Sequence, residues 1–155
     1  MLKPRIGLSL FSGGGITETY FREIGIHIAV ANELIPERAK FYQYTHPNTE
    51  MVCGDITDEY IFKKVIRKAK EAGVTFLLAT PPCQGMSTLG KREYISDKRN
   101  SLIHYVLETI NVLDPDYVLI ENVPKFIELL YNFDGTTHNS EESNCKPYHI
   151  VELLE

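Results

Sequence analysis

The chain has 155 residues, of which 43% are apolar and 24% are charged. These proportions are typical of a globular domain and exclude collagen-like, coiled-coil and wholly disordered chains. A domain of this length buries about 70% of the surface that its unfolded chain exposes, so we expect a real hydrophobic core. The 16 basic and 21 acidic residues give a net charge of −5, the opposite of the broad basic surface of a self-sufficient nucleic-acid binder.

The lack of recognisable targeting signals and the spacing of the cysteines predict a cytoplasmic protein. The sequence has no apolar run long enough to span a membrane and no signal-peptide cleavage pattern after its first residues. Its three cysteines, Cys53, Cys83 and Cys145, have no Cys-x-x-Cys spacing, which argues against a zinc site or a set of disulfides. We therefore expect reduced thiols and no metal, with Cys53 in the core and Cys145 incidental.

Apolar segments typical of strands alternate along the chain with segments of helical periodicity. This α/β pattern predicts parallel strands joined by crossover helices. The predicted strands cover residues 5–10, 26–32, 51–53, 75–80 and 117–121, and the predicted helices cover residues 17–24, 36–44, 58–72 and 100–113. Residues 75–79 and 117–120 are nearly continuous apolar runs, which predicts strands covered on both faces.

The last part of the sequence predicts an unfinished domain. Residues 132–144 are polar and rich in turn-forming residues, so we expect a surface loop. Residues 147–155 begin an amphipathic helix, and no strand follows to bury its apolar face. We therefore interpret residues 1–155 as the N-terminal part of a larger catalytic domain that is incomplete at its C-terminus.

A glycine-rich turn, Phe11–Gly15, follows the first predicted strand. A strand, glycine turn and helix in this order let backbone amides approach a ligand closely. The dinucleotide fingerprint is incomplete, because Glu18 stands where its third glycine would be, and this argues against a nicotinamide or flavin cofactor. Glu33 lies 20 residues after Gly13, the spacing at which a carboxylate reaches ribose hydroxyls. We predict an adenosine-containing cofactor; the alternative is a plain tight turn and a solvated Glu33.

A second carboxylate, Asp55, follows the third predicted strand. Alone it could equally be the N-cap of the next helix. Gly13, Glu33 and Asp55, however, follow three successive strands, and the carboxyl ends of parallel strands share one edge of a sheet. A pocket at that edge is therefore predicted.

The strongest catalytic candidate is Cys83, directly after Pro81 and Pro82. Two prolines stiffen the chain where it leaves the strand, so the next residue is held in a defined direction. A thiol at a ligand-binding edge is suited to act as a nucleophile, although a free cysteine with a pKa of about 8.5 needs local activation. The alternative is a structural cysteine.

Glu121 ends the last predicted strand and brings a further carboxyl group to the same edge. A glutamate at the end of a buried strand is poorly solvated, which favours its neutral form and makes it a candidate acid. The alternative is a carboxylate that caps a helix or pairs with Lys125.

Six blocks of the sequence together resemble the C5-cytosine methyltransferase family, in the family's order. They are Phe11–Gly15, Asn32–Glu33, Gly54–Ile56, Pro81–Gln84, Asp97–Leu102 and Glu121–Val123. The resemblance implies a Rossmann-like S-adenosylmethionine-dependent methyltransferase fold, which is a mostly parallel sheet with flanking helices. It also implies that the cofactor S-adenosylmethionine is converted to S-adenosylhomocysteine. It implies a cofactor site lined by Phe11, Ser12, Gly13, Gly15, Glu33, Leu34, Asp55, Ile56, Pro82 and Leu102.

The resemblance also implies the reaction. The Cys83 thiolate would add to C6 of cytosine while Glu121 protonates or hydrogen-bonds N3, so that C5 can accept a methyl group. The target base would have to be flipped out of double-stranded DNA, at a cost of a few kcal/mol. The residues implied to contact this substrate are Gln84, Ser87, Lys91, Arg92 and Asn122. The alternative for the segment after Cys83 is an ordinary exposed loop.

The sequence also departs from the family pattern. Many members have Asp where this chain has Ser9, and a further glycine where it has Ile16. The family's Gln-x-Arg-x-Arg element and target-recognition region have no counterpart among these residues. Since those parts carry much of the DNA contact, their absence accounts for the acidic charge.

We therefore expect a DNA cytosine-5 methyltransferase of a bacterial or archaeal restriction-modification system, or an orphan enzyme. One alternative is a tRNA cytosine-5 methyltransferase. Another is a non-catalytic S-adenosylmethionine-binding subunit that needs a second polypeptide. A nicotinamide-dependent oxidoreductase is the weakest alternative, because of Glu18.

Overall fold

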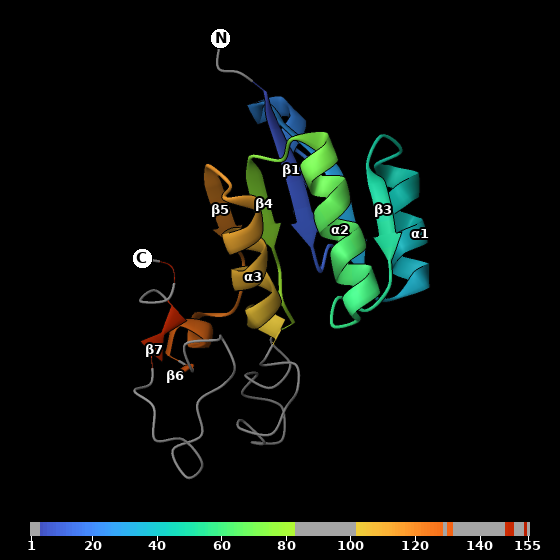
Figure 1. Ribbon diagram of the computed structural model, residues 1–155. Coiled ribbons are helices and arrows are strands. Elements are labelled where there is room, and N and C mark those ends of the chain that lie inside the picture. The colour runs from blue at the N-terminus through green and yellow to red at the C-terminus, as the bar shows by residue number, and fades with distance from the viewer. Residues whose placement is uncertain (1–3, 83–101, 129, 132–147, 151–153, 155) are drawn as a thin grey trace. The chain divides into compact units, whose positions relative to one another are not determined.

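The computed structural model describes residues 4–82, 102–128, 130–131, 148–150 and 154 (Figure 1). The chain divides into two compact units. The first, called the sheet unit below, contains residues 1–80 and 109–120, and the second contains residues 81–108 and 121–155.

The sheet unit is built on five parallel strands in the order β3-β2-β1-β4-β5. The strands are β1 (Arg5–Leu10), β2 (Ile26–Glu33), β3 (Glu50–Cys53), β4 (Phe76–Ala79) and β5 (Tyr117–Ile120). All five agree with the predicted strands to within a residue or so at each end. The predicted α/β fold with a parallel sheet is therefore confirmed.

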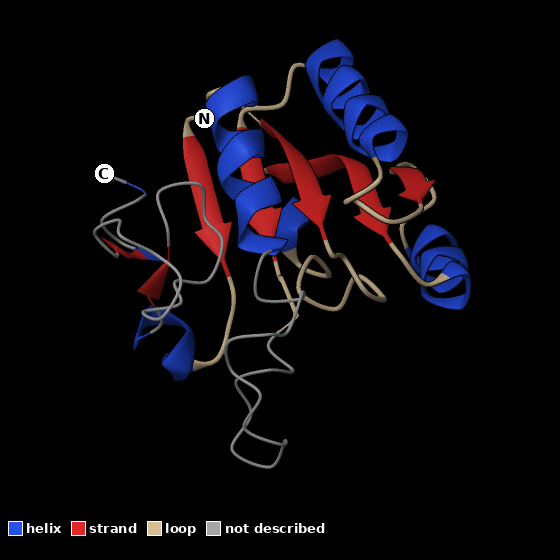
Figure 2. Ribbon diagram, turned by 60° about the horizontal axis from the view of Figure 1, so that its bottom comes forward, coloured by secondary structure: helices blue, strands red, loops and turns tan. Residues whose placement is uncertain are grey.

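Three α-helices accompany the strands, namely α1 (Pro36–Thr45), α2 (Glu59–Ala72) and α3 (Ile103–Leu113). The side chain of Asp58 accepts hydrogen bonds from the first amides of α2, and Gly73 ends that helix with a φ of 68°. Helices α1 and α2 lie on opposite faces of the sheet (Figure 2). Such a double layer covers the central strands on both sides, which explains why β4 is buried at every residue.

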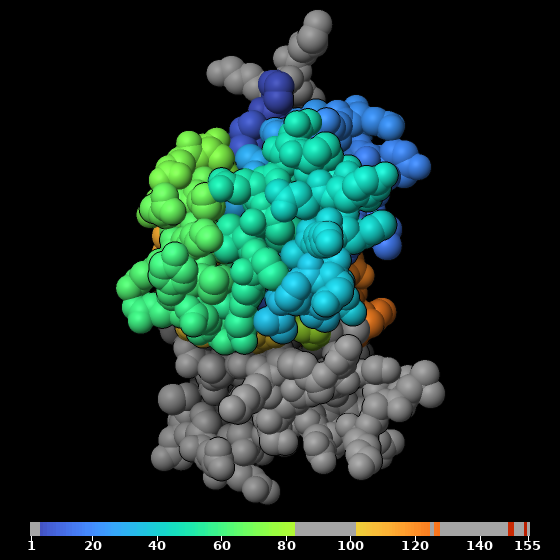
Figure 3. Space-filling model, turned by 90° about the vertical axis from the view of Figure 1, so that its right-hand side faces the viewer, coloured from blue at the N-terminus to red at the C-terminus, as the bar shows by residue number. Residues whose placement is uncertain are grey.

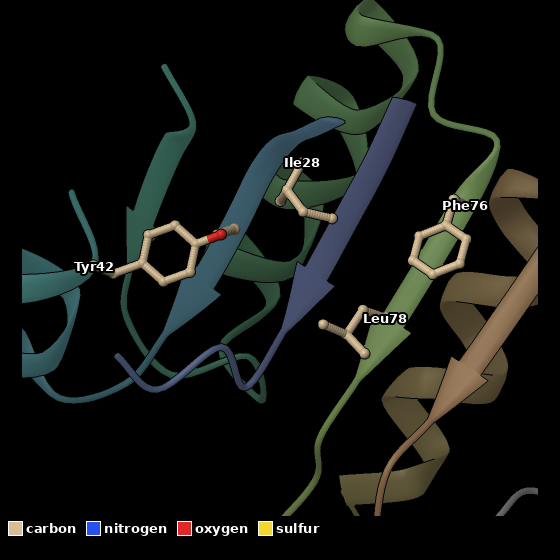
Figure 4. Packing of buried hydrophobic residues seen from close by; sticks show 5 residues of the cluster. Ile28, Tyr42, Phe76 and Leu78 are labelled. Atoms are coloured by element: carbon tan, nitrogen blue, oxygen red, sulfur yellow. The ribbon is translucent and has the colours of Figure 1, made fainter. Parts of the chain in front are cut away.

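The α1 face of the sheet carries a core cluster of Ile28, Ala31, Tyr42, Phe76 and Leu78 (Figure 4). Tyr42 comes from α1 and its hydroxyl points toward β2, while Phe76 and Leu78 come from alternate positions of β4. The short 3-10 helix η1 (Phe21–Ile24) adds its first residue, whose ring meets the ring of Phe76 edge-on at 5.8 Å between centroids. The core of this face is therefore closed by α1 and η1 together.

Strand β2 contains a bulge where it pairs with β1. Gly7 pairs with Ile28, but the next residue, Leu8, pairs with Val30, so Ala29 is an extra residue. Because of the bulge, Ile28 and Ala31 belong to the same core cluster although three positions separate them. This extra residue therefore determines on which face of the sheet the side chains of the last residues of β2 lie.

The predicted helix over residues 17–24 is wrong, since only the four residues of η1 are helical there and turns precede them. Two side chains explain the difference. The Thr19 hydroxyl donates to the carbonyl oxygen of Ile16, a local bond that competes with helical pairing. Glu18 is 3% exposed because its carboxylate bonds to Ser9 in the interior.

The prediction that residues 117–120 are covered on both faces is also wrong. Tyr117, Val118 and Leu119 in β5 are 52%, 37% and 43% exposed. In the described part of the chain β5 is the last strand of the sheet, paired with β4 on one side. At the opposite end of the sheet, β3 contacts both α1 and α2, and Figure 3 shows this cyan and green side of the molecule. An apolar run therefore predicted the strand correctly but not its surroundings.

The second unit contains the 3-10 helix η3 (Pro124–Glu128) and a two-stranded antiparallel ribbon of β6 (Leu130–Tyr131) and β7 (Tyr148–His149). The helix predicted from residue 147 is wrong at its start, because residues 148–149 pair with β6 and helical conformation is described at Ile150 and Leu154. The predicted loop 132–144 lies outside the described residues. Among the described helices, none has the length and apolarity needed to cross a membrane.

Paired leucines on β4 and β5 test the difference in burial. Leu78 is fully buried and pairs in register with Leu119, which is 43% exposed. We expect Leu78→Ala to lower the free energy of unfolding by about 2–5 kcal/mol, because it leaves a cavity. The same change at Leu119 should cost about 1 kcal/mol or less, because less buried surface is removed. Urea denaturation of both variants measures this, and equal losses would contradict the exposure of β5.

Candidate functional site

The glycine turn after β1 is shaped by backbone conformations that favour glycine. Gly13 and Gly15 have φ values of 56° and 76°, and Phe11 has a φ of 58°, which is rare for a bulky residue. The Phe11 carbonyl oxygen accepts a hydrogen bond of 2.9 Å from the Thr80 hydroxyl, just past the end of β4. Unusual backbone at the head of a sheet, held by specific bonds, is a common property of ligand-binding turns.

Glu33, at the end of β2, is held against the glycine turn. One carboxylate oxygen accepts from the Gly13 amide and the other from the Ile35 amide, each at 2.8 Å. The residue is 5% exposed. The sequence predicted that Gly13 and Glu33 share a site, and the structure brings them into direct contact. The alternative of a solvated Glu33 is therefore wrong.

Ser12 and Asn32 join the glycine turn to the ends of the neighbouring strands. The Ser12 amide and hydroxyl both donate to the Asn32 carbonyl oxygen, at 3.0 and 3.1 Å. The Asn32 side-chain amide donates to the carbonyl oxygens of Val52 and Gly54, at 2.9 and 3.0 Å. Asn32 was predicted only as part of a motif, and the structure gives it a structural role in aligning β2 with the end of β3.

Asp55 lies just after β3 and is exposed. Its Oδ1 accepts from both the amide and the hydroxyl of Thr57, which leaves Oδ2 as an acceptor for a ligand. It is not the N-cap of α2, since Asp58 has that position. Ile56 beside it is 4% exposed, so only a small part of its surface could meet a ligand. Leu34, after Glu33, is 58% exposed.

Cys53, at the end of β3, corrects another expectation. It was predicted to be a core residue, but it is exposed and its thiol is free. Its strand lies at the edge of the sheet, where the burial pattern leaves both terminal residues of β3 open.

Gly15 in the glycine turn lies against a stacked pair of rings, Tyr42 in α1 and His46 just past the end of that helix. The rings of Tyr42 and His46 lie 4.5 Å apart between centroids, at an interplanar angle of 26°. A Cβ atom added to Gly15 would lie 2.6 Å from the His46 ring and 2.8 Å from the Tyr42 ring. A cavity of about 320 Å³ borders Gly15 and His46 but is lined by neither Glu33 nor Asp55. Of the predicted cofactor residues, the cavity is therefore lined by Gly15 but not by the two carboxylates.

Glu18 is a buried carboxyl group directly behind the glycine turn. The Ser9 hydroxyl donates to its Oε1 at 2.5 Å. Burial raises the pKa of Glu18, and the Ser9 bond, the charge of His46 and the hydroxyl of Tyr42 offset part of that rise. Burial and the nearby charge of Glu18 also raise the pKa of Tyr42. From the sequence, Glu18 was identified only as the residue in place of a third glycine. The available signal for a buried partner was Ser9, a polar residue between apolar neighbours in a predicted strand.

In the second unit, Asn122 links the two segments that leave β4 and β5. Its side-chain amide donates to the Pro81 carbonyl oxygen at 3.0 Å, and its side-chain oxygen accepts from the Val123 amide at 2.8 Å. Asn122 was predicted to contact the substrate. In the structure both ends of its amide bond to backbone groups, one of them at Pro81, two residues before Cys83. Pro82 and Leu102 are half-buried.

Glu121 directly follows β5 and is exposed. The expectation that it is poorly solvated is wrong in the described structure, because the strand that carries it is itself half exposed. Its proposed role as an acid stays a prediction.

Several predicted residues lie outside the described part of the chain. They are Cys83, Gln84, Ser87, Lys91 and Arg92. Within the described ranges, His, Cys, Asp and Glu side chains form no group that could hold a metal ion.

Comparison with protein families gives one match over most of the chain. A family model described as C-5 cytosine-specific DNA methylase matches residues 7–143. The type II methyltransferase M1.HgaI of Avibacterium volantium is 52% identical over 139 residues, which cover 87% of this chain and 39% of that protein. The type II methyltransferase M.AquIA of Picosynechococcus is 32% identical, over 77% of this chain and 49% of that protein.

A tRNA (cytosine(38)-C(5))-methyltransferase of Rattus norvegicus is 26% identical, over 81% of this chain and 32% of that protein. The chain therefore spans less than half the length of each of these three relatives. Among solved structures, a DNMT2 mutant of Spodoptera frugiperda has a TM-score of 0.58 and 27% identity, over 79% of this chain and 36% of that one. The Dnmt2 methyltransferase of S. pombe has the same TM-score at 21% identity, over 80% and 35%, which supports the fold alone.

The buried carboxyl group gives a pH-dependent stability. Because the folded pKa of Glu18 is raised above its ordinary value of 4.5, its contribution is fully present below that value and is lost as the pH rises through the folded pKa. The side chain of Gln in Glu18→Gln does not titrate. The unfolding free energy of this variant, relative to that of the unmodified chain, should therefore rise between about pH 4 and about pH 7. Urea denaturation at several pH values measures the difference.

Glu59→Gln is the matched control for this experiment. The pKa of exposed Glu59 is lowered by its bond with Lys63, so this variant should lose stability relative to the unmodified chain over the same pH change. A Glu18→Gln profile parallel to that of Glu59→Gln would contradict the buried state of Glu18.

Proposed function

This chain belongs to the C-5 cytosine-specific DNA methylase family, and on that premise we propose that it is the cofactor-binding and catalytic part of a DNA cytosine-5 methyltransferase. The observation that carries the proposal is the direct contact of Glu33 with the glycine turn, at the head of the parallel sheet. The enzyme would act on cytosine in double-stranded DNA, in the cytoplasm, as in a type II restriction-modification system.

The residues at the heads of β1, β2 and β3 fit S-adenosylmethionine. Glu33 is fixed by two amides, and each of its oxygens keeps a lone pair that can accept a bond from a ribose hydroxyl. Asp55 Oδ2 would accept from a donor group of the adenine ring, and the backbone of Ser12 to Gly15 would approach the cofactor closely. Phe11, Leu34, Ile56, Pro82 and Leu102 would supply the apolar contacts. When bound, this cofactor supplies the methyl group.

Cys83 and Glu121 would carry the chemistry on the cytosine ring. The thiolate sulfur of Cys83 forms a bond to C6, while Glu121 gives a proton or a hydrogen bond to N3, so that C5 becomes nucleophilic. After C5 is methylated, a base removes the C5 proton, the sulfur–carbon bond breaks and the thiolate leaves. Asn122 supports this assignment, because it ties the backbone just before Cys83 to the segment that follows Glu121.

Base flipping is required, since neither C6 nor C5 can be attacked within a base stack. Gln84, Ser87, Lys91 and Arg92 would contact the DNA around the flipped cytosine. Phosphate contacts need more positive charge than a chain of net charge −5 offers. Further residues of a longer protein or a second polypeptide would supply that surface and the base-specific contacts.

The test of the nucleophile is covalent trapping on DNA that contains 5-fluorocytosine, in an active preparation that includes this chain. The fluorine cannot leave as a proton does, so the adduct through Cys83 should accumulate and Cys83→Ser should abolish it. Cys53→Ser is the matched control, because Cys53 is an exposed free thiol on β3 and should leave trapping unchanged. Adduct formation by Cys83→Ser would sink the assignment.

The second candidate substrate is tRNA, and the 26% identity with the rat tRNA methyltransferase favours it as the alternative. Methyl transfer to duplex DNA and to tRNA should be compared in the same preparation. We expect transfer to DNA, in line with the 52% identity with a type II methyltransferase. Transfer to tRNA alone would replace DNA as the substrate and leave the rest of the proposed chemistry unchanged.

A further inference from the structure

The buried pair of Ser9 and Glu18 has no place in the reaction described above, yet it connects the two sides of the glycine turn. Ser9 belongs to β1, just before the turn, and Glu18 follows the turn. Their side chains meet at 2.5 Å, so this single hydrogen bond closes a loop that contains Gly13, Gly14 and Gly15. Ser9 is fully buried and Glu18 is 3% exposed.

A hydroxyl and a carboxyl group are costly in this position. Ser9 pairs in register with Ala31 and Leu78, and both of these belong to the apolar core cluster on the α1 face. Burying two polar groups among such neighbours is unfavourable unless they bond to each other. The nearby Tyr42 hydroxyl is itself buried without a well-formed hydrogen bond in the described part of the chain. A core without these groups would be easier to stabilise, so a role beyond stability is indicated.

The glycine turn needs such a constraint because three consecutive glycines have more conformational freedom than any other tripeptide. Contacts on several sides restrict it. Glu33 holds the Gly13 amide, and the Tyr42–His46 ring stack lies against Gly15. The Ser9–Glu18 bond fixes the remaining freedom, which is the separation of the two ends of the turn.

We propose that Glu18 is a positioning residue, which through its hydrogen bond with Ser9 presets the glycine turn for an adenosine-containing cofactor. The proposal rests on the proposed function for the identity of that cofactor, but not for the ordering of the turn. A turn that is ordered before binding loses less conformational entropy when the ligand arrives, so the bond should strengthen binding without touching the ligand.

The test combines amide hydrogen exchange of the turn with calorimetric titration of S-adenosylmethionine into the full 155-residue chain. In Ser9→Ala the carboxyl group loses its donor. We expect the Gly13 and Gly15 amides to exchange about tenfold faster and the cofactor to bind about tenfold more weakly, as the loss of one buried hydrogen bond implies. Glu18→Gln keeps an acceptor oxygen for Ser9, so both quantities should stay within about twofold of the unmodified chain.

Val65→Ala is the control for a merely structural effect. Val65 is a fully buried residue of α2, and its truncation should lower stability while leaving turn exchange and cofactor binding unchanged in the folded chain. The proposal is overturned if Ser9→Ala leaves the turn amides as protected as before, or if Val65→Ala loosens the turn to the same extent.

The two proposals can fail separately. If the unmodified chain does not bind S-adenosylmethionine, the proposed cofactor is wrong, and hydrogen exchange alone decides the role of Glu18. If the unmodified chain binds and Ser9→Ala binds equally well, the cofactor stands and the positioning role of Glu18 is wrong.

Discussion

The candidate site depends on the point at which the central strand β1 stops pairing with both of its neighbours. Leu10 is the last residue of β1, and it pairs with Asn32 on one side and with Ala79 on the other. Beyond it the backbone turns into the left-handed region at Phe11, and hydrogen bonds from residues at or just past the ends of β2 and β4, namely Asn32, Glu33 and Thr80, hold the first residues of the glycine turn. A parallel sheet brings the ends of its strands to one edge, and the candidate site lies at the edge where β1, β2 and β4 end.

Sequence reasoning worked best where one local cause determines one local structure. The apolar run before Pro81 predicted β4, and the positions of Gly13 and Glu33 after successive strands predicted one shared edge of the sheet, where the structure places them in contact. In both cases the pattern lies in the segments that form the structure, which are strands of one sheet and the residues that directly follow them. The motif blocks were correspondingly sufficient to identify the family.

The failures share a different cause, because they concern surroundings that a local pattern does not encode. The apolar run of β5 looks like that of β4, but only the structure reveals that one strand is central and the other lies at the end of the described sheet. Cys53 was assigned to the core for the same reason. Glu18 is a further case, since the sequence showed only that it stands in the position of a glycine, whereas the structure shows that it is buried and bonded to Ser9.

The extra residue in β2 has a consequence for how the site tolerates sequence change. Side chains of a strand alternate between faces, so the odd or even position of a residue decides which face it serves, and Ala29 reverses this parity between Ile28 and Ala31. Glu33 lies two residues beyond Ala31 and therefore depends on that reversal to meet Gly13. A replacement at Ala29 alters one side chain, whereas a deletion there would turn the Glu33 carboxylate toward the other layer of helices. In this strand the count of residues carries as much functional information as their identity.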